Sequence, residues 1–182
     1  EKMLAAKEAG FDFIEISIDE TDAKLARLDM SGEERLELGS LMRETGVPIR
    51  TMCLSGHRKY PLGSNDPEIC ARGMEIMEKA IILAEDLGIR IIQLAGYDVY
   101  YEEGSQETKE RFEKNLRKAA EMAARAGVVM GFETMETEFM NTVEKAMVYV
   151  NKVDSPYLNV YPDLGNITNA AVTYGTDVLE DL

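Results

Sequence analysis

The sequence lacks the signals that identify several large classes of protein. No stretch approaches the roughly 18 consecutive apolar residues of a membrane-spanning helix. No apolar segment is followed by a glycine-rich loop of the G-x-G-x-x-G or G-K-[ST] type, which binds nucleotide phosphates. Lys and Arg number 20 against 34 Asp and Glu, and the resulting net charge of −14 would repel a phosphate backbone. We therefore expect neither a membrane nor a nucleic acid as partner.

Cysteine is also scarce. Cys53 and Cys70 form no metal-binding or redox motif. A disulfide between them stays open, but two reduced thiols are the simpler interpretation, and reduced thiols are typical of a cytoplasmic protein. The sequence thus favours a cytoplasmic location.

The chain does contain a regular alternation of apolar and helical segments. Its 182 residues are 45% hydrophobic and show no break in composition, which predicts one domain spanning residues 1–182. Segment starts are separated by roughly 30 to 40 residues, the size of one strand-plus-helix unit. Since no Asn-Gly hairpin signal joins them, we expect parallel strands. The predicted strands are Phe11–Ser17, Ile49–Leu54, Arg90–Ala95, Val128–Glu133 and Leu158–Asp163.

Helix boundaries between these segments are marked by capping residues. The first ten residues have the character of the end of a helix. Polar N-cap residues, one of them within an S-x-x-E capping box, begin the later helices, and three of these helices end at a glycine. The predicted helices run from Ser31 to Gly46, from Asp66 to Gly88, from Ser105 to Gly127 and over Thr142–Val153.

Polar residues inside the strands distinguish a closed barrel from a doubly wound sheet. In 128–134, Val128, Met130 and Phe132 share one face, whereas Gly131 and Glu133 share the other. An apolar outer face under helices and a polar face at the mouth are typical of a β/α barrel, whose active site lies at the carboxyl ends of its strands. We predict a (β/α)8 barrel of which this chain holds about strands two to six, since a complete barrel needs roughly 250 residues.

Two carboxylates are the principal candidates for chemistry. Glu133 and Asp163 lie within apolar strands, where a charge is costly unless it is paired, protonated or bound to a cation. On adjacent strands they could share one divalent ion, with Mg²⁺ or Mn²⁺ favoured by oxygen ligands alone and Zn²⁺ or Mn²⁺ favoured if histidine is added. Separate structural carboxylates are an equally open alternative.

Further polar residues near the strand ends could contact a substrate. The basic sequence His57-Arg58-Lys59 is conspicuous in so acidic a chain and would suit an anionic group such as phosphate. A solvated loop, ordinary aromatic packing and internal amide hydrogen bonds are the structural alternatives. The candidate substrate-binding residues are Glu15, Ser55, His57, Arg58, Lys59, Ser64, Gln93 and Tyr97.

Several of these strings resemble one family nearly from end to end of the chain. They resemble the L-ribulose-5-phosphate (L-xylulose-5-phosphate) 3-epimerases, which are xylose-isomerase-like barrels of bacterial ascorbate and pentose degradation, and some of whose members are called hexulose-6-phosphate isomerases. The strings are Phe11-Asp-Phe-Ile-Glu15-Ile-Ser17, Met52-Cys-Leu-Ser55-Gly-His57-Arg58, Pro61-Leu-Gly-Ser64, Ile92-Gln93-Leu-Ala-Gly96-Tyr97-Asp98-Val-Tyr100-Tyr101 and Tyr161-Pro-Asp163-Leu-Gly-Asn166.

The resemblance implies one divalent metal ion, Zn²⁺, Mn²⁺ or Mg²⁺, held by Glu, Asp, His and Glu. Glu133 matches the first ligand and Asp163 the second, and Glu133 also matches one of two catalytic carboxylates. The other ligands and the other carboxylate would lie beyond Leu182, so we expect a central piece of a longer protein. His57 matches the stretch after the third barrel strand, a candidate phosphate contact.

The function implied is metal-dependent 3-epimerisation of a phosphorylated L-ketopentose through a cis-enediolate. A related aldose–ketose isomerase of sugar phosphates and an inactive fragment of such a barrel are the alternatives. A DNA-repair endonuclease on this fold would need several histidines and a basic face, and the chain has one histidine. The implied partner is a small sugar phosphate, and pairing of two copies in a homodimer stays open.

Overall fold

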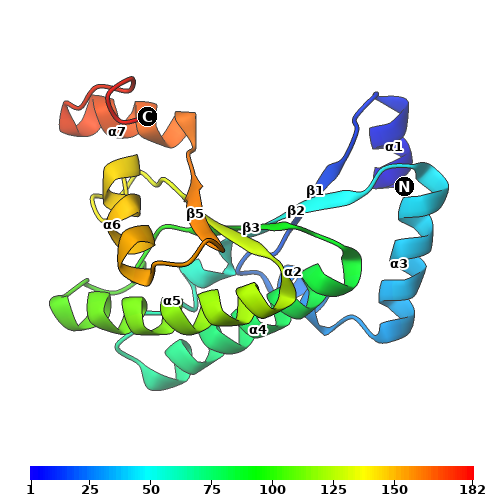
Figure 1. The fold of residues 1–182 in the computed structure, drawn as a ribbon, viewed down its shortest axis with the longest axis horizontal. Coiled ribbons are helices and arrows are strands. Elements are labelled where there is room, and N and C mark those ends of the chain that lie inside the picture. Colours follow the sequence, from blue (N-terminus) through cyan, green and yellow to red (C-terminus); the bar gives the residue numbers. More distant parts are fainter.

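The computed structural model describes residues 1–182 and contains one parallel sheet (Figure 1). Its five strands are hydrogen-bonded in chain order, without any reversal. A doubly wound sheet reverses its strand order at a switch point, so this topology supports the predicted barrel. The strands are β1 (Ile14–Ser17), β2 (Ile49–Leu54), β3 (Ile91–Ala95), β4 (Val129–Glu133) and β5 (Leu158–Tyr161).

Helices lie between and beyond the strands, and none is long and apolar enough to span a membrane. They are α1 (Lys2–Glu8), α2 (Asp22–Leu25), α3 (Gly32–Thr45), α4 (Pro67–Leu87), α5 (Gln106–Ala126), α6 (Val143–Val153) and α7 (Leu164–Tyr174), with 3-10 turns η1 (Ala26–Asp29) and η2 (Ser55–Arg58). The predicted N-caps of α3, α4 and α5 are confirmed, and Thr142, the predicted first residue of α6, is an N-cap as well: each accepts a backbone hydrogen bond from the first helical turn.

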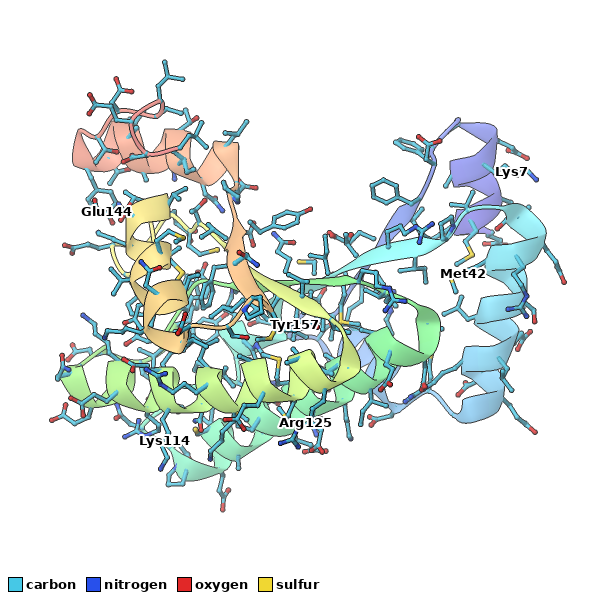
Figure 2. The ribbon with its side chains drawn as sticks, in the orientation of Figure 1. Lys7, Met42, Lys114, Arg125, Glu144 and Tyr157 are labelled. Atoms are coloured by element: carbon cyan, nitrogen blue, oxygen red, sulfur yellow. The ribbon has the colours of Figure 1, made fainter.

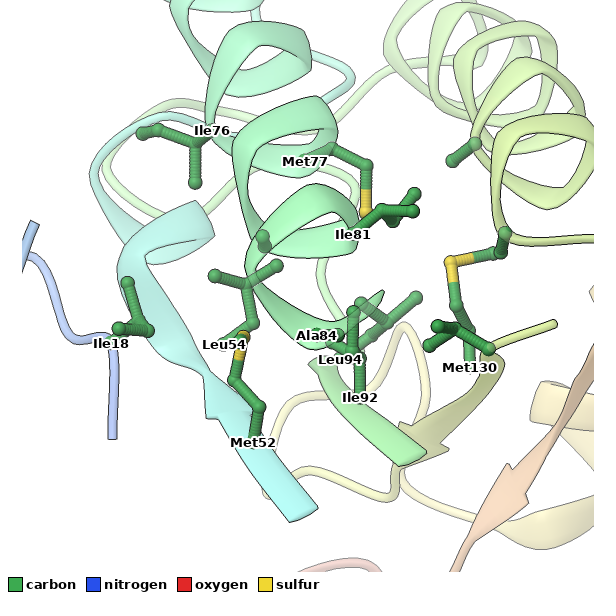
Figure 3. Close-up of a cluster of buried hydrophobic side chains, with 14 of the residues drawn as sticks. Ile18, Met52, Leu54, Ile76, Met77, Ile81, Ala84, Ile92, Leu94 and Met130 are labelled. Atoms are coloured by element: carbon green, nitrogen blue, oxygen red, sulfur yellow. The ribbon is translucent and has the colours of Figure 1, made fainter. Parts of the chain in front are cut away.

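One face of the sheet packs against the helices and forms the core. Met52, Ile92, Met130 and Phe132 are almost fully buried, and they meet apolar side chains of α4 and α5 such as Met77 (Figure 3). Charged residues occupy the opposite side of these helices, as Lys114 and Arg125 do on α5 (Figure 2). The predicted apolar face of β4 is therefore confirmed, and β2 and β3 contribute to the same apolar face.

The sheet is open along β1 and β5, and the segments before β1 and after β5 carry exposed apolar side chains. Phe11 is 64% exposed before β1, and Val172 is 82% exposed on α7, which follows β5. Figure 1 shows α1 and α3 at one end of the sheet, α6 and α7 at the other, and α4 and α5 beneath it.

Two predicted strand boundaries were wrong by more than one residue, and the predicted starts at Arg90 and Val128 each lie one residue before the observed ones. The first strand begins at Ile14 rather than Phe11, which is largely exposed. The last ends at Tyr161 rather than Asp163, because Pro162 has no N–H to donate to a ladder. Asp163 instead caps α7, a helix whose bounds were not predicted.

The turn after β2 is held against α4 by close backbone packing. A Cβ at Gly73 of α4 would lie 2.3 Å from the Tyr60 carbonyl oxygen, so the glycine is needed for this approach. The same residue also accepts a hydrogen bond from buried His57, whose Nε2 lies 3.1 Å from the Gly73 carbonyl oxygen. These contacts fix the position of η2, which leads out of the sheet at its carboxyl edge.

We predict opposite effects for two Gly→Ala substitutions in helices. Gly73→Ala should lower the free energy of unfolding by about 1–3 kcal/mol, because the new Cβ overlaps Tyr60. Gly39→Ala in α3 meets only the end of Arg43, at 3.6 Å, and should raise stability by up to about 1 kcal/mol. Urea unfolding of both variants checks this, and an equally stabilised Gly73→Ala would contradict the packing described.

Candidate active site

The face of the sheet that points away from α4 and α5, called the inner face below, carries polar side chains at neighbouring positions. Parallel register aligns Cys53, Gln93 and Gly131 on β2, β3 and β4, and Glu133 lies two residues beyond Gly131. Gln93 is 8% exposed. Gly131 leaves room for Tyr161 of β5, whose Cβ would be 3.1 Å from a Cβ at this glycine. The strand order thus brings Gln93, Glu133 and Tyr161 to one end of the inner face.

Glu15 lies on the same face at the edge strand β1. Its carboxylate accepts a hydrogen bond from Thr51 Oγ1 of β2 at 2.6 Å, and Thr51 is 8% exposed. This bond restrains a carboxylate that is otherwise exposed. Cys53, next along β2, is a free thiol like Cys70, in agreement with the prediction of two unbridged cysteines.

Glu133 has the most perturbed carboxyl group of the candidate site. Burial and the neighbouring Asp163 carboxylate raise the pKa of Glu133 to about 7, whereas the positive charge of Arg58 opposes this rise. The two predicted carboxylates are therefore close enough to repel each other. Such a pair carries excess negative charge that a bound cation would offset.

Asp163 is held by the first turn of α7 and by the strand beside it. One carboxylate oxygen, Oδ1, accepts a hydrogen bond from the backbone N–H of Asn166 at 2.7 Å. Its own backbone N–H donates to Thr134 Oγ1 at 2.9 Å. Asp163 is thus tied to the residue that follows Glu133.

Arg58 lies close enough to Glu133 to act on its charge, and it packs against tyrosines of the loop after β3. The Arg58 guanidinium lies 5.2 Å from the ring centre of Tyr100, and Tyr97 and Tyr100 meet edge to face at 4.7 Å. The buried Nε of Arg58 has no hydrogen-bond partner within the chain. The Tyr101 hydroxyl donates to Glu20 at 3.0 Å. Arg58 thus combines a positive charge with an unused donor.

Three other predicted substrate contacts lie apart from this cluster. His57 is 6% exposed and turned toward α4, an arrangement that favours a structural role. Ser64 is 1% exposed, and its hydroxyl donates to the Glu102 carboxylate. Lys59 is exposed above the Tyr60 ring, with Nζ 5.4 Å from the ring centre. Ser55, in contrast, is half-buried at the carboxyl end of β2.

Three residues of this region were missed by the sequence analysis. Thr51 restrains Glu15, and Thr134 and Asn166 link the ends of β4 and β5. The spacing of Asp163 and Asn166, three residues apart after a proline, was an available sign of a helix N-cap. No sequence pattern marks the hydroxyls of Thr51 and Thr134 as partners of residues 36 and 29 positions away.

Comparison with known proteins places this geometry in a family. The model of the xylose isomerase-like TIM barrel family matches residues 3–181. The chain belongs to this family. It is also 52% identical over 168 residues to the L-ribulose-5-phosphate 3-epimerase UlaE of Salmonella typhimurium, a match that covers 92% of the chain and 59% of that relative. The chain therefore spans about three fifths of the relative's length.

Solved structures show the same architecture. The D-psicose 3-epimerase of Clostridium cellulolyticum H10, studied with D-tagatose, superposes with a TM-score of 0.77 at 20% identity, over 92% of the chain and 58% of that structure. A xylose isomerase-like TIM barrel protein of Mycobacterium smegmatis, in complex with magnesium, superposes with a TM-score of 0.72 at 16% identity, over 91% and 56%. At these identities the likeness establishes the fold alone, and it supports the prediction of an incomplete barrel.

The burial of His57 predicts an unusual titration. Desolvation lowers the pKa of His57 from 6.5 to about 4. Below pH 6.5 the unfolded chain binds a proton at His57 that the folded chain takes up only near pH 4. The contribution of His57 to the free energy of unfolding is therefore fully present above pH 6.5 and is lost as the pH falls toward 4. The loss from this residue should reach roughly 3 kcal/mol.

Because the chain has one histidine, proton NMR can follow this ring without ambiguity. A ring pKa near 6.5 would mean that His57 is accessible to solvent and available to substrate. Urea unfolding of wild type and His57→Gln between about pH 7.5 and pH 4.5 isolates the contribution of the histidine from that of the carboxylates, since glutamine does not titrate.

Proposed function

We propose that the full-length protein containing this chain is a 3-epimerase of a phosphorylated L-ketopentose, with L-ribulose 5-phosphate and L-xylulose 5-phosphate as the epimer pair. The observation that carries the proposal is the proximity of Glu133 and Asp163 at adjacent strand ends of a family barrel. The identity with a named L-ribulose-5-phosphate 3-epimerase supports the choice of substrate.

Glu133 and Asp163 would hold one divalent cation, Mg²⁺, Mn²⁺ or Zn²⁺. The donor set fits, because two mutually repelling carboxylate groups supply the hard oxygen ligands that such ions prefer. No group of three His, Cys, Asp or Glu side chains comes together in these 182 residues, so further donors would be needed. When bound, the cation supplies Lewis-acid stabilisation for negative charge on the substrate oxygens.

The proton transfers would fall to carboxylates. Removal of the proton at C3 leaves a planar cis-enediolate, and return of a proton to the opposite face inverts that carbon. Glu133 would serve one face. Gln93 and Glu15, which share the inner face of the sheet, would bind substrate hydroxyls, and Tyr97 and Ser55 would border the mouth.

Arg58 is the best candidate for the substrate phosphate. Its charge and its contact with the Tyr100 ring fit an anion that enters beside Glu133. Lys59, one residue on, is exposed and would add a more distant positive charge. His57 remains neutral at physiological pH because burial lowers its pKa to about 4, so it would add no charge to this site.

Deuterium exchange tests the reaction. The full-length protein with Mn²⁺ should incorporate solvent deuterium at C3 of L-ribulose 5-phosphate, and Glu133→Gln should reduce the rate by at least about 100-fold, because the amide cannot exchange the proton. Glu138→Gln removes an exposed carboxylate from the following loop and should keep the wild-type rate.

Incorporation by Glu133→Gln at the wild-type rate would refute the role of this residue. No incorporation by the wild type with Mn²⁺, Mg²⁺ or Zn²⁺ would refute the epimerase itself. Deuterium at C1 or C2 with an aldose product would instead identify an aldose–ketose isomerase.

Substrate selectivity tests Arg58. Arg58→Met should lower kcat/KM for L-ribulose 5-phosphate by about 10- to 100-fold, the value of one hydrogen bond to a charged group, and leave unphosphorylated L-ribulose almost unaffected. Arg50→Met removes the same charge from an exposed side chain near the opposite end of β2 and serves as the control. Equal losses for both substrates would exclude Arg58 as a phosphate contact.

A further inference from the structure

The backbone ladder between β4 and β5 stops before it reaches Asp163. Its last paired residues are Glu133 and Tyr161. Pro162 follows, and it cannot donate to a ladder. The relative position of the two carboxylates is therefore set by contacts beyond the sheet.

Side chains of Thr134 and Asn166 provide those contacts. The Thr134 hydroxyl accepts from the Asp163 backbone N–H at 2.9 Å and lies 3.4 Å from the Asp163 carbonyl oxygen. The Asn166 side-chain amide donates to the Thr134 carbonyl oxygen at 2.9 Å, while the Asn166 backbone N–H donates to Asp163 Oδ1 at 2.7 Å. Thr134, which follows Glu133, thus bonds to the backbone of Asp163. Asn166, which lies three residues after Asp163, bonds to the backbone of Thr134.

The surroundings make this arrangement rigid. Thr134 is 0% exposed, so a lost hydrogen bond there would leave a buried polar group without a partner. Ile167, next to Asn166 on α7, is also fully buried and anchors the start of the helix. Oδ1 of Asp163 accepts the hydrogen bond from the first turn of α7, which fixes the rotation of the carboxylate. The second oxygen is left for other partners.

Gly165 adds an independent constraint. A Cβ at this position would lie 3.1 Å from Asp163 Oδ1, closer than an ordinary van der Waals contact. A side chain at residue 165 would therefore press on the Asp163 carboxylate and shift it by a few tenths of an ångström. An alanine there would favour the helix but push the carboxylate.

We infer that Thr134 and Asn166 act as positioning residues, which hold the Asp163 carboxylate at a fixed place relative to Glu133 so that the two can share one divalent cation. This inference rests on the proposed function, because it concerns the same pair of carboxylates. Hydrogen bonds that orient metal ligands usually change metal affinity by about 10- to 100-fold when they are lost.

Calorimetric titration with Mn²⁺ of the full-length protein tests the inference. Thr134→Val, which keeps the shape but removes the hydroxyl, should bind Mn²⁺ about 10- to 100-fold more weakly than wild type. Thr134→Ser restores the hydroxyl and should recover most of the affinity. Thr142→Val removes a comparably buried N-cap hydroxyl from α6, where no proposed ligand lies, and should bind Mn²⁺ as wild type does.

Gly165→Ala keeps the test decisive if Thr134→Val fails to fold. This variant should unfold no more easily than wild type, yet bind Mn²⁺ about 10-fold more weakly. Wild-type affinity in Thr134→Val, or in Gly165→Ala when Thr134→Val cannot be purified, would overturn the inference and leave the proposed function standing. A wild-type protein that binds no divalent cation would overturn both.

Discussion

The apolar face of the parallel sheet packs against α4 and α5, and this burial fixes the direction in which the remaining side chains of each strand point. Because side chains alternate along a strand, Met130 and Phe132 point into the core beneath the helices. Gly131 and Glu133 must then lie on the opposite, inner face of the sheet. The in-register pairing then places the polar residues of successive strands beside one another. The candidate site is thus a geometric consequence of a core that contains none of its residues.

The site brings two carboxylates together at a place where they are partly shielded from water. Glu133 and Asp163 repel each other and are partly removed from water, while Arg58 offsets only part of their charge. A protein keeps such an arrangement at a cost in stability, since carboxylates are better solvated apart. Strain of this kind at the carboxyl end of barrel strands is typical of binding and catalysis.

Connections between the strands contribute as much as the strands do. The turn after β2 is fixed to α4 through Gly73, so that Arg58 at its end can reach the mouth while His57 is directed into the core. At the other end of the site, Thr134 continues the contact between β4 and β5 beyond the last ladder pair. The first connection uses the Gly73 backbone carbonyl as acceptor and the second uses the Thr134 hydroxyl, and no sequence pattern reveals either pairing.

Local propensity and side-chain periodicity were enough to predict the parallel strands, the helix starts at Ser31, Asp66, Ser105 and Thr142, and the inward direction of Glu133. Neighbouring basic residues also looked equivalent at that level. The tertiary structure distinguishes Arg58 from the two other predicted phosphate contacts. Arg58 packs on Tyr100, whereas His57 and Ser64 are buried in contacts with distant segments. Likewise, the tertiary structure alone assigned Asp163 to the start of α7 and joined it to Thr134, because hydrogen bonds across 29 residues depend on where the chain has already packed.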